Sequence, residues 1–196
     1  MEIDLAAYFT FAIITGITPG PNNISAFSFS MNMGYSKAIK YILGIITGTF
    51  VVMLICSFLS GTLLNTMPII ADYMKYAGAA YILWLAFKTL RANYDQKSKI
   101  EIAGFGNGLT LQFVNPKAYM YGITVYSTFF APLSGSYLWL SLSALLICLI
   151  TFLCVSTWSI SGGLIKRFMH NNTIKTIINI VMALALVYTS YKIVSL

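Results

Sequence analysis

Long apolar runs dominate this sequence and limit what the chain can fold into. Runs of about 20 residues with few charges recur along the chain, separated by short charged or turn-rich pieces. Of the 196 residues, 58% are hydrophobic and only 9% are charged, whereas a soluble domain carries about 25% charged residues. Because so little polar surface is available, the sequence predicts an all-α membrane protein whose helices face lipid.

Six apolar segments can be delimited, and we expect six transmembrane helices. They lie at about 5–33, 38–64, 71–91, 105–131, 136–161 and 173–194. Together they predict a single integral membrane transporter domain, 1–196, without room for a soluble domain. The start carries Glu2 and Asp4 in place of a basic region and lacks a small-residue cleavage site. We therefore expect the first segment to be a span rather than a removed signal peptide.

Basic residues gather in alternate connections, which predicts the orientation of the chain. The connections near 34–40, 92–104 and 162–172 are basic, whereas those near 65–70 and 132–135 carry no Lys or Arg. By the positive-inside rule, the basic connections face the cytoplasm and both termini lie outside it. The net charge of +7 then reflects membrane topology, and no nucleic-acid partner is expected. The basic residues in question are Lys37, Lys40, Lys88, Arg91, Lys97, Lys99, Lys166, Arg167 and Lys175.

Two proline motifs interrupt the first and fourth segments. Residues 17–25 read ITPGPNNIS, and residues 110–122 read TLQFVNPKAYMYG. Pro21 and Pro116 are 95 positions apart (116 − 21), nearly half the chain, and three segments start from each. An odd number of crossings in each half forces the halves into opposite orientations. We therefore predict two inverted three-helix repeats, about 1–95 and 100–196, a pattern typical of transporters. Two proline kinks without functional meaning are the alternative.

Each interruption is predicted to expose backbone polar groups inside the membrane. Proline ends a helix but suits the first turn of the next one, so we expect half-helices to begin at Pro21 and Pro116. The free N–H groups of those first turns cannot face lipid, and must line a protein cavity or a watery one. The carbonyls of the preceding helix ends, near 15–18 and 111–114, are expected to be free as acceptors.

The predicted substrate site combines two positive helix ends, side-chain amides and one lysine. This set suits a carboxylate, while the freed carbonyls and Gln112 would receive the ammonium of an amino acid. Two plainer interpretations stand beside it: Lys117 snorkels from a shallow re-entrant segment, and Asn22 and Asn23 only cap their half-helix. From the residues alone, the predicted substrate-binding side chains are Asn22, Asn23, Gln112, Asn115 and Lys117.

Neither catalytic residues nor a metal or other cofactor is expected. One histidine and three scattered cysteines do not form a metal cluster, and phosphate-loop and serine-hydrolase signatures are absent. No Asp or Glu lies in the interior of a predicted span, so a carboxylate proton relay is not available. Proton coupling would have to use Lys117, a tyrosine such as Tyr121 or Tyr126, or protonation of the substrate.

Gly44 and Gly48 form a small-residue face in LGIITG, which permits close contact between helices. The face either packs inside the molecule, which we favour, or forms the seam of a homodimer.

The motifs also resemble those of the LysE/RhtB superfamily of amino-acid exporters. The matching pieces are TPGPNN, LGIITG, AGAAYILWLAFK and LQFVNPKA, and the resemblance covers essentially the whole chain. The stretch LQFVN…YGITVYSTF looks most like the branch that exports cysteine and O-acetylserine. The resemblance implies six transmembrane helices in the bacterial inner membrane and amino-acid efflux driven by the proton-motive force. It also implies that the family's signature residues belong to the substrate-binding set, which by position adds Thr18, Pro19, Gly20, Pro21 and Pro116 to Asn22, Asn23, Gln112, Asn115 and Lys117. Many members carry an acidic residue where this chain has Thr49, so a small neutral amino acid is expected rather than lysine or arginine.

The leading hypothesis is therefore an exporter of small neutral amino acids or derivatives (cysteine, O-acetylserine, homoserine/threonine type) that works by alternating access. A passive small-solute channel is the alternative, but it would need a continuous polar stripe through all spans, whereas polar residues gather at the two interruptions. A membrane-embedded enzyme would need a titratable cluster, which Lys117 alone does not make. The expected partners are the amino-acid substrate and membrane lipid, and the direction of transport rests on the resemblance.

Overall fold

The computed structural model describes residues 3–59, 68–91, 104–133, 135–165 and 171–195. Within these ranges every regular element is helical, which confirms the all-α prediction. Residues 92–103, in the basic connection predicted near 92–104, and parts of the connections predicted near 65–70 and 162–172 lie outside the described residues. The elements are α1 (Leu5–Ile17), α2 (Pro21–Met33), α3 (Tyr35–Leu59), α5 (Pro68–Leu90), α6 (Phe105–Phe113), α7 (Pro116–Thr124), the π-helix η1 (Val125–Phe129), the 3₁₀ turn η2 (Ala131–Leu133), α8 (Tyr137–Ile165) and α9 (Asn172–Ser195).

The first basic connection is much shorter than expected. A single residue, Gly34, separates α2 from α3, where the sequence predicted a connection over 34–40. Gly34 has φ = 86°, a conformation in which a Cβ atom would be strained, and its N–H donates to the Ser30 carbonyl to close α2. Because glycine can reverse the chain in one step, α3 begins at Tyr35.

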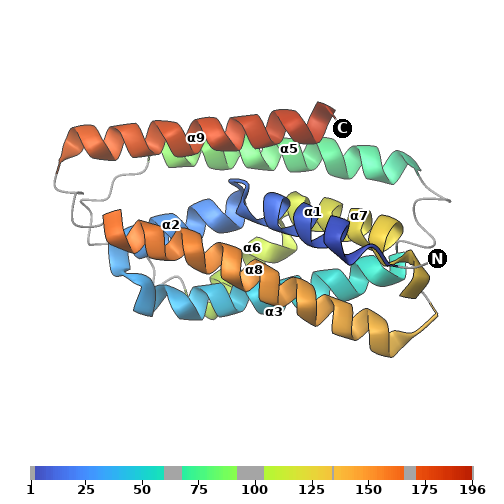
Figure 1. Ribbon diagram of the computed structural model, residues 1–196. Helices are drawn as coiled ribbons and strands as arrows, with labels where there is room; N and C mark the ends of the chain where they lie inside the picture. The colour runs from blue at the N-terminus through green and yellow to red at the C-terminus, as the bar shows by residue number, and fades with distance from the viewer. Residues whose placement is uncertain (1–2, 60–67, 92–103, 134, 166–170, 196) are drawn as a thin grey trace.

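The helices form a core and a two-helix layer beside it (Figure 1). In the core, α2 packs along α8 and α6 packs along α3, while α5 and α9 pack along each other as the layer. The layer touches the core mainly where α5 meets α7. Both the core and the layer therefore combine helices from the first half of the chain with helices from the second half.

The molecule has two ends, which the helix directions define. We call the end at which α1 begins and α3 ends the N-terminal end, and the end at which α2 turns into α3 the far end. The short helices α1 and α7 occupy the half toward the N-terminal end, and α2 and α6 occupy the half toward the far end (Figure 1). The non-helical stretches 18–20 and 114–115 consequently lie between the two halves.

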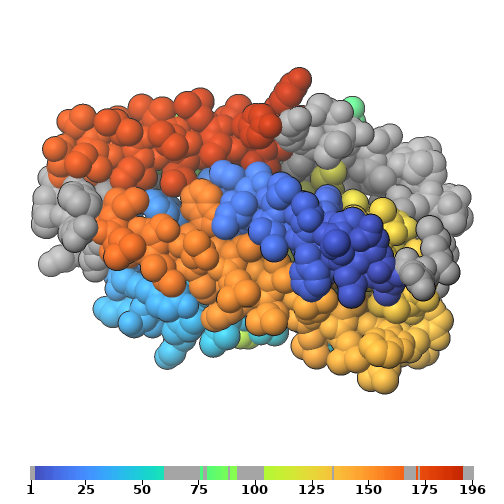
Figure 2. Space-filling model, in the orientation of Figure 1, coloured from blue at the N-terminus to red at the C-terminus, as the bar shows by residue number. Residues whose placement is uncertain are grey.

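Within the described ranges, three helices are long and apolar enough to cross a membrane, namely α3, α8 and residues 173–191 of α9, and α1 is a shorter apolar helix. Figure 2 shows α1 and α8 side by side on one face of the molecule. Large apolar side chains of these two helices are exposed, as is expected of a surface that faces lipid rather than water. On α8 they are Leu138, Leu142, Leu145, Leu149, Leu153, Ile160 and Leu164.

Glycines let the core helices approach one another closely in the far half. A Cβ atom on Gly44 would collide with the carbonyl oxygen of Phe105, and one on Gly48 would lie 2.7 Å from Cβ of Gln112. These contacts join α3 to α6, so the internal-packing interpretation of Gly44 and Gly48 is confirmed. On α8, a Cβ atom on Gly162 would collide with the carbonyl oxygen of Phe27 in α2.

Two neighbouring glycines of α8 test this close packing. Gly162→Ala should destabilise the protein by about 1–3 kcal/mol, because the added methyl group has to displace the backbone of Phe27. Gly163→Ala is the matched control: its Cβ atom would meet only the Tyr35 nitrogen at 3.8 Å. Alanine should there stabilise the helix by up to about 1 kcal/mol. Thermal unfolding of the purified variants in one detergent measures both effects, and equal midpoints would contradict the role given to Gly162.

Candidate functional site

The first interruption begins where two prolines leave helix carbonyls without donors. An α-helical carbonyl accepts from the N–H four residues later, and Pro19 and Pro21 occupy that position for Thr15 and Ile17. The helix α1 ends at Ile17, and α2 begins at Pro21 with Gly20 as its N-cap. The Ile17 carbonyl is satisfied from another helix, since Nε1 of Trp158 in α8 donates to it at 3.0 Å.

The neighbouring carbonyls are also occupied by side chains. Nδ2 of Asn23 donates to the carbonyls of Gly16 (2.8 Å) and Thr18 (3.0 Å). The ammonium of Lys117 donates to the Thr18 carbonyl at 2.9 Å, and Oγ1 of Thr189 in α9 donates to the Pro19 carbonyl at 2.8 Å. The sequence analysis expected the carbonyls near 15–18 to be free for a ligand, but the protein itself binds those of residues 16, 17 and 18.

The second interruption is closed by its own cap. Pro116 removes the donor for the Gln112 carbonyl, which accepts instead from the backbone N–H of Asn115 at 3.2 Å. The Asn115 side chain then accepts from the N–H of Lys117 at 3.1 Å, so α7 has a side-chain N-cap. The first turn of α2 has none, because its N-cap is Gly20. Among the described residues, no acceptor meets the backbone N–H of Asn22 or Asn23.

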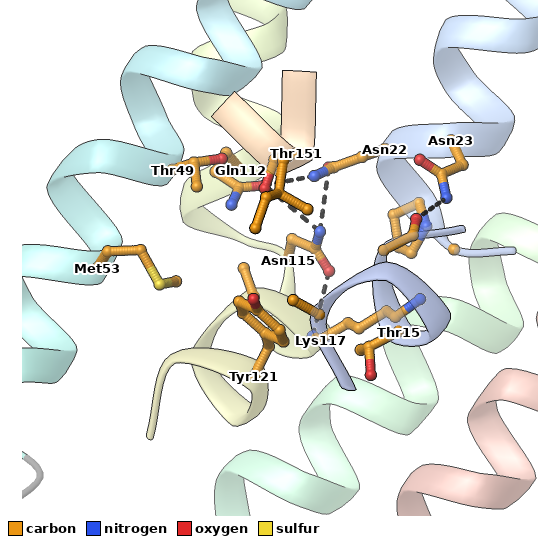
Figure 3. Close-up of a pocket in the computed structure, with 16 residues that line it drawn as sticks. Thr15, Asn22, Asn23, Thr49, Met53, Gln112, Asn115, Lys117, Tyr121 and Thr151 are labelled. Atoms are coloured by element: carbon orange, nitrogen blue, oxygen red, sulfur yellow. Dashed lines mark hydrogen bonds between the residues drawn. The ribbon is translucent and has the colours of Figure 1, made fainter. Parts of the chain in front are cut away.

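Three amide side chains connect the two interruptions (Figure 3). Nδ2 of Asn22 donates to Oε1 of Gln112 at 2.7 Å, and Nδ2 of Asn115 donates to Oδ1 of Asn22 at 3.0 Å. Nδ2 of Asn115 also lies 3.5 Å from Oε1 of Gln112. Gln112 is only 2% exposed, and its Nε2 group makes no hydrogen bond to the described residues. One amide donor is thus left unused beside the network.

Lys117 points from α7 back toward the first interruption. Its Nζ atom bonds to Thr18 across 99 positions of sequence. A Cβ atom on Gly20 would lie 3.1 Å from Cδ and 3.2 Å from Nζ of Lys117, so the missing side chain of Gly20 makes room for the lysine. The ammonium is therefore directed to the interior of the molecule. The snorkelling interpretation had instead placed it at the membrane surface.

A cavity of about 70 Å³ lies where the two interruptions meet. Seven predicted residues line it: Gly20, Pro21, Asn22, Asn23, Gln112, Asn115 and Lys117. The predicted residues Thr18, Pro19 and Pro116 do not line the cavity. The carbonyls of Thr18 and Pro19 nevertheless accept hydrogen bonds from Lys117 and Thr189, respectively. The remaining lining residues are Ala12, Thr15, Gly16, Thr49, Met53, Ala118, Tyr121, Ile150 and Thr151.

Sequence reasoning missed the wall that α3 and α8 supply. Met53 and Ile150 lie in uninterrupted apolar helices, where nothing distinguishes a cavity residue from an ordinary core residue. Thr151 gives a weak signal, since a hydroxyl in an apolar run needs a partner. Thr157 and Thr49 donate to their own helix four residues back, but Thr151 makes no such bond in the described chain. Its hydroxyl is free to face the cavity (Figure 3).

The chemistry of the cavity suits a small molecule with one carboxylate. Lys117 is the one ordinarily charged side chain among its lining residues, and no Asp or Glu of the described chain lines it. Backbone and side-chain amides supply the neutral donors, and Met53 and Ile150 supply an apolar wall. Among these residues no carboxylate is present to pair with a cationic side chain of a bound molecule.

Comparison with known proteins places the whole chain in one family. The family model described as LysE type translocator matches residues 13–195. The cysteine/O-acetylserine efflux protein of Salmonella paratyphi A is 38% identical over 191 residues, which cover 96% of each chain. The protein of the same name from Escherichia coli K12 is 34% identical over 190 residues, again 96% of each. No solved structure matches. With its apolar helices, this multi-pass membrane protein belongs to the LysE type translocator family.

Proposed function

We propose that the protein exports small neutral amino acids or their derivatives, of the cysteine and O-acetylserine type, from the bacterial cytoplasm across the inner membrane. The observation that carries the proposal is the cavity in which both helix interruptions, three amide side chains and Lys117 converge. The names of the relatives support the same substrate class. We further propose that the substrate binds in this cavity.

The uncapped first turn of α2 is the proposed carboxylate position. The N–H groups of Asn22 and Asn23 have no acceptor in the described chain, and a helix N-terminus favours an anion. Lys117 lies beside this turn with its ammonium held by a neutral carbonyl rather than by an acid. A substrate carboxylate would give this cation its first negatively charged partner, which makes a charge-assisted hydrogen bond.

The substrate ammonium is proposed to meet the Thr15 carbonyl. This carbonyl lacks its helical donor because Pro19 has no N–H, and Thr15 lines the cavity. The short side chain of the substrate would then lie toward Met53 and Ile150. Because this wall carries no charge, a thiol or an ester fits there and a cationic side chain does not.

Alternating access of two inverted repeats is the proposed mechanism. The helix pairs support it, because exchanging the halves of the chain maps the contact of α2 with α8 onto that of α7 with α3, and the contact of α6 with α3 onto that of α1 with α8. The contacts of α3 with α8 and of α5 with α9 map onto themselves. We propose six membrane crossings, of which the interrupted pairs α1–α2 and α6–α7 each form one. Exposed Lys37, Lys40 and Arg91 lie at the far end, so the positive-inside rule directs that end to the cytoplasm and both termini to the periplasm.

The proton-motive force is the proposed energy source, with Lys117 as the coupling group. Lys117 can release its proton and still accept a hydrogen bond in its neutral form, whereas no carboxylate of the described chain lines the cavity. Exchange of the ammonium between the Thr18 carbonyl and the substrate would link proton and substrate movement.

Removing either polar anchor should stop export. Lys117→Ala and Asn22→Ala should each lower efflux at least about tenfold, because each leaves buried partners unsatisfied and removes a substrate contact. Cysteine and O-acetylserine appearing in the medium of cells that express the protein measure the effect. Lys37→Ala, at an exposed position outside the cavity, is the matched control and should export normally. Near-normal efflux from both site variants, at equal amounts in the membrane, would refute the site.

Collapsing the proton gradient should separate an exporter from a passive channel. In proteoliposomes loaded with a panel of amino acids, an imposed proton gradient should accelerate the release of small neutral substrates, and an ionophore should abolish the acceleration. The physical reason is that a coupled carrier moves substrate only with its driving ion, whereas a pore conducts regardless. A release rate that is the same with and without the proton gradient would favour the channel. A chemically altered product would favour an enzyme.

A further inference from the structure

Aromatic rings close the cavity toward the N-terminal end. The ring of Phe11 stacks on that of Tyr121 with centroids 5.8 Å apart, and it lies 5.5 Å from the ring of Phe129. The ring of Tyr8 lies 4.7 Å from that of Phe130. We call these five residues the aromatic cluster. Tyr8 and Phe11 come from α1, Tyr121 comes from α7, and Phe129 and Phe130 come from η1 and its end. The contacts therefore join α1 to α7 and η1, which are far from it in sequence.

The cluster begins where the cavity ends. Ala12 of α1 and Tyr121 of α7 line the cavity. Tyr8 precedes Ala12 by one helical turn on the same face of α1, and both are buried. A molecule that moved from the cavity along α1 toward the N-terminal end would therefore meet Tyr8 and its ring neighbours directly.

Tyr8 brings a buried hydroxyl to the edge of the cavity. The residue is 0% exposed, and its hydroxyl makes no hydrogen bond of normal geometry in the described part of the chain, although it interacts with the hydroxyl of Tyr121, which lines the cavity. A buried hydroxyl without a well-formed hydrogen bond costs free energy that phenylalanine would avoid. Its presence beside the cavity is explained if a polar molecule contacts it during part of the working cycle.

The far end is closed in a different way. There the core helices touch through glycines whose added Cβ atoms would collide with backbone: Gly44 and Gly108 join α3 to α6, and Gly162 joins α8 to α2. Separating such helices requires whole backbones to move. In the aromatic cluster the contacts are between rings, which rotate and shift more readily than closely packed backbones.

The backbone on one side of the cluster is already irregular. The N–H of Phe130 donates to the Val125 carbonyl at 3.0 Å, five residues back, which is the π-helical pattern of η1. Such segments are rare and occur often at functional sites. This π-helix carries Phe129 and ends at Phe130, so a local return to α-helical geometry would turn both rings away from α1.

We propose that the aromatic cluster is the gate between the cavity and the N-terminal end, and that the Tyr8 hydroxyl is the first polar group a zwitterionic substrate contacts there. The role of the substrate rests on the proposed function, whereas the gate itself can be tested without any substrate.

Cysteine labelling tests the gate. Thr151→Cys places a thiol of similar size on the cavity wall, while the three native cysteines are buried and serve as the background. Adding Phe11→Ala should raise the rate at which a small, membrane-impermeant thiosulfonate modifies this thiol by about tenfold, because ring contacts of this kind shift an equilibrium by about that factor. The rise should occur only when the reagent is on the side of the N-terminus, as sealed vesicles of both orientations reveal.

The controls separate gating from general loosening. Ile13→Ala changes an exposed residue of the same helix and should leave the rate unchanged. Phe129→Ala opens the cluster from its other side and should reproduce the effect of Phe11→Ala, which keeps the test decisive should Phe11→Ala fail to fold. An unchanged rate in the folded gate variants, or an equal rise from both sides of the membrane, would overturn the gate.

Tyr8→Phe tests the hydroxyl separately. The ring stays in place, so the labelling rate should not change, whereas efflux should fall about tenfold through loss of one hydrogen bond to the moving substrate. Normal efflux from Tyr8→Phe would overturn the role of the hydroxyl. The gate variants could show the expected one-sided rise in labelling rate while the protein exports none of the tested substrates. That result would refute the proposed function and would still support the gate.

Discussion

The requirement that every backbone polar group inside a membrane finds a hydrogen-bond partner governs this structure. Pro19, Pro21 and Pro116 each deprive one helical carbonyl of its donor. Trp158 from α8 binds the Ile17 carbonyl, the backbone N–H of Asn115 binds the Gln112 carbonyl, and Thr15 lies at the cavity. Thr189 from α9 also binds the Pro19 carbonyl, so donors from two distant helices stabilise the first interruption and fix α8 and α9 beside the cavity.

The two interruptions also stabilise each other. Lys117, in the first turn of α7, binds the carbonyl of Thr18 before α2, and Asn115 binds the side chain of Asn22. The polar residues of the cavity therefore have structural partners when no ligand is present. A bound carboxylate would have to compete with these partners, so binding and a change in the contact between the half-helices are physically connected.

Sequence reasoning reached the helical class and the helix starts at Pro21 and Pro116, because the effect of proline on a helix is local and depends on few residues. It also singled out the amides and Lys117 that line the cavity, since polar residues stand out in an apolar sequence. It did not reach Trp158 or Thr189 as carbonyl donors, nor Met53 and Ile150 as cavity wall. Those roles depend on which helices meet in three dimensions, and apolar helices carry little sequence signal for their neighbours. The one-residue turn at Gly34 was missed for a different reason: only its φ of 86° reveals how sharply the chain reverses.

Thr189 connects the two-helix layer to the turn beside the cavity through a hydrogen bond. Its hydroxyl oxygen lies 2.8 Å from the Pro19 carbonyl oxygen and 2.9 Å from that of Ala185 in its own helix, and next to it Ser190 binds the Ala79 carbonyl of α5. The layer cannot slide along the core without lengthening the bond to Pro19. A displacement of α9 would therefore change the hydrogen bonding of residues 18–20, the turn that leads into the cavity at Gly20.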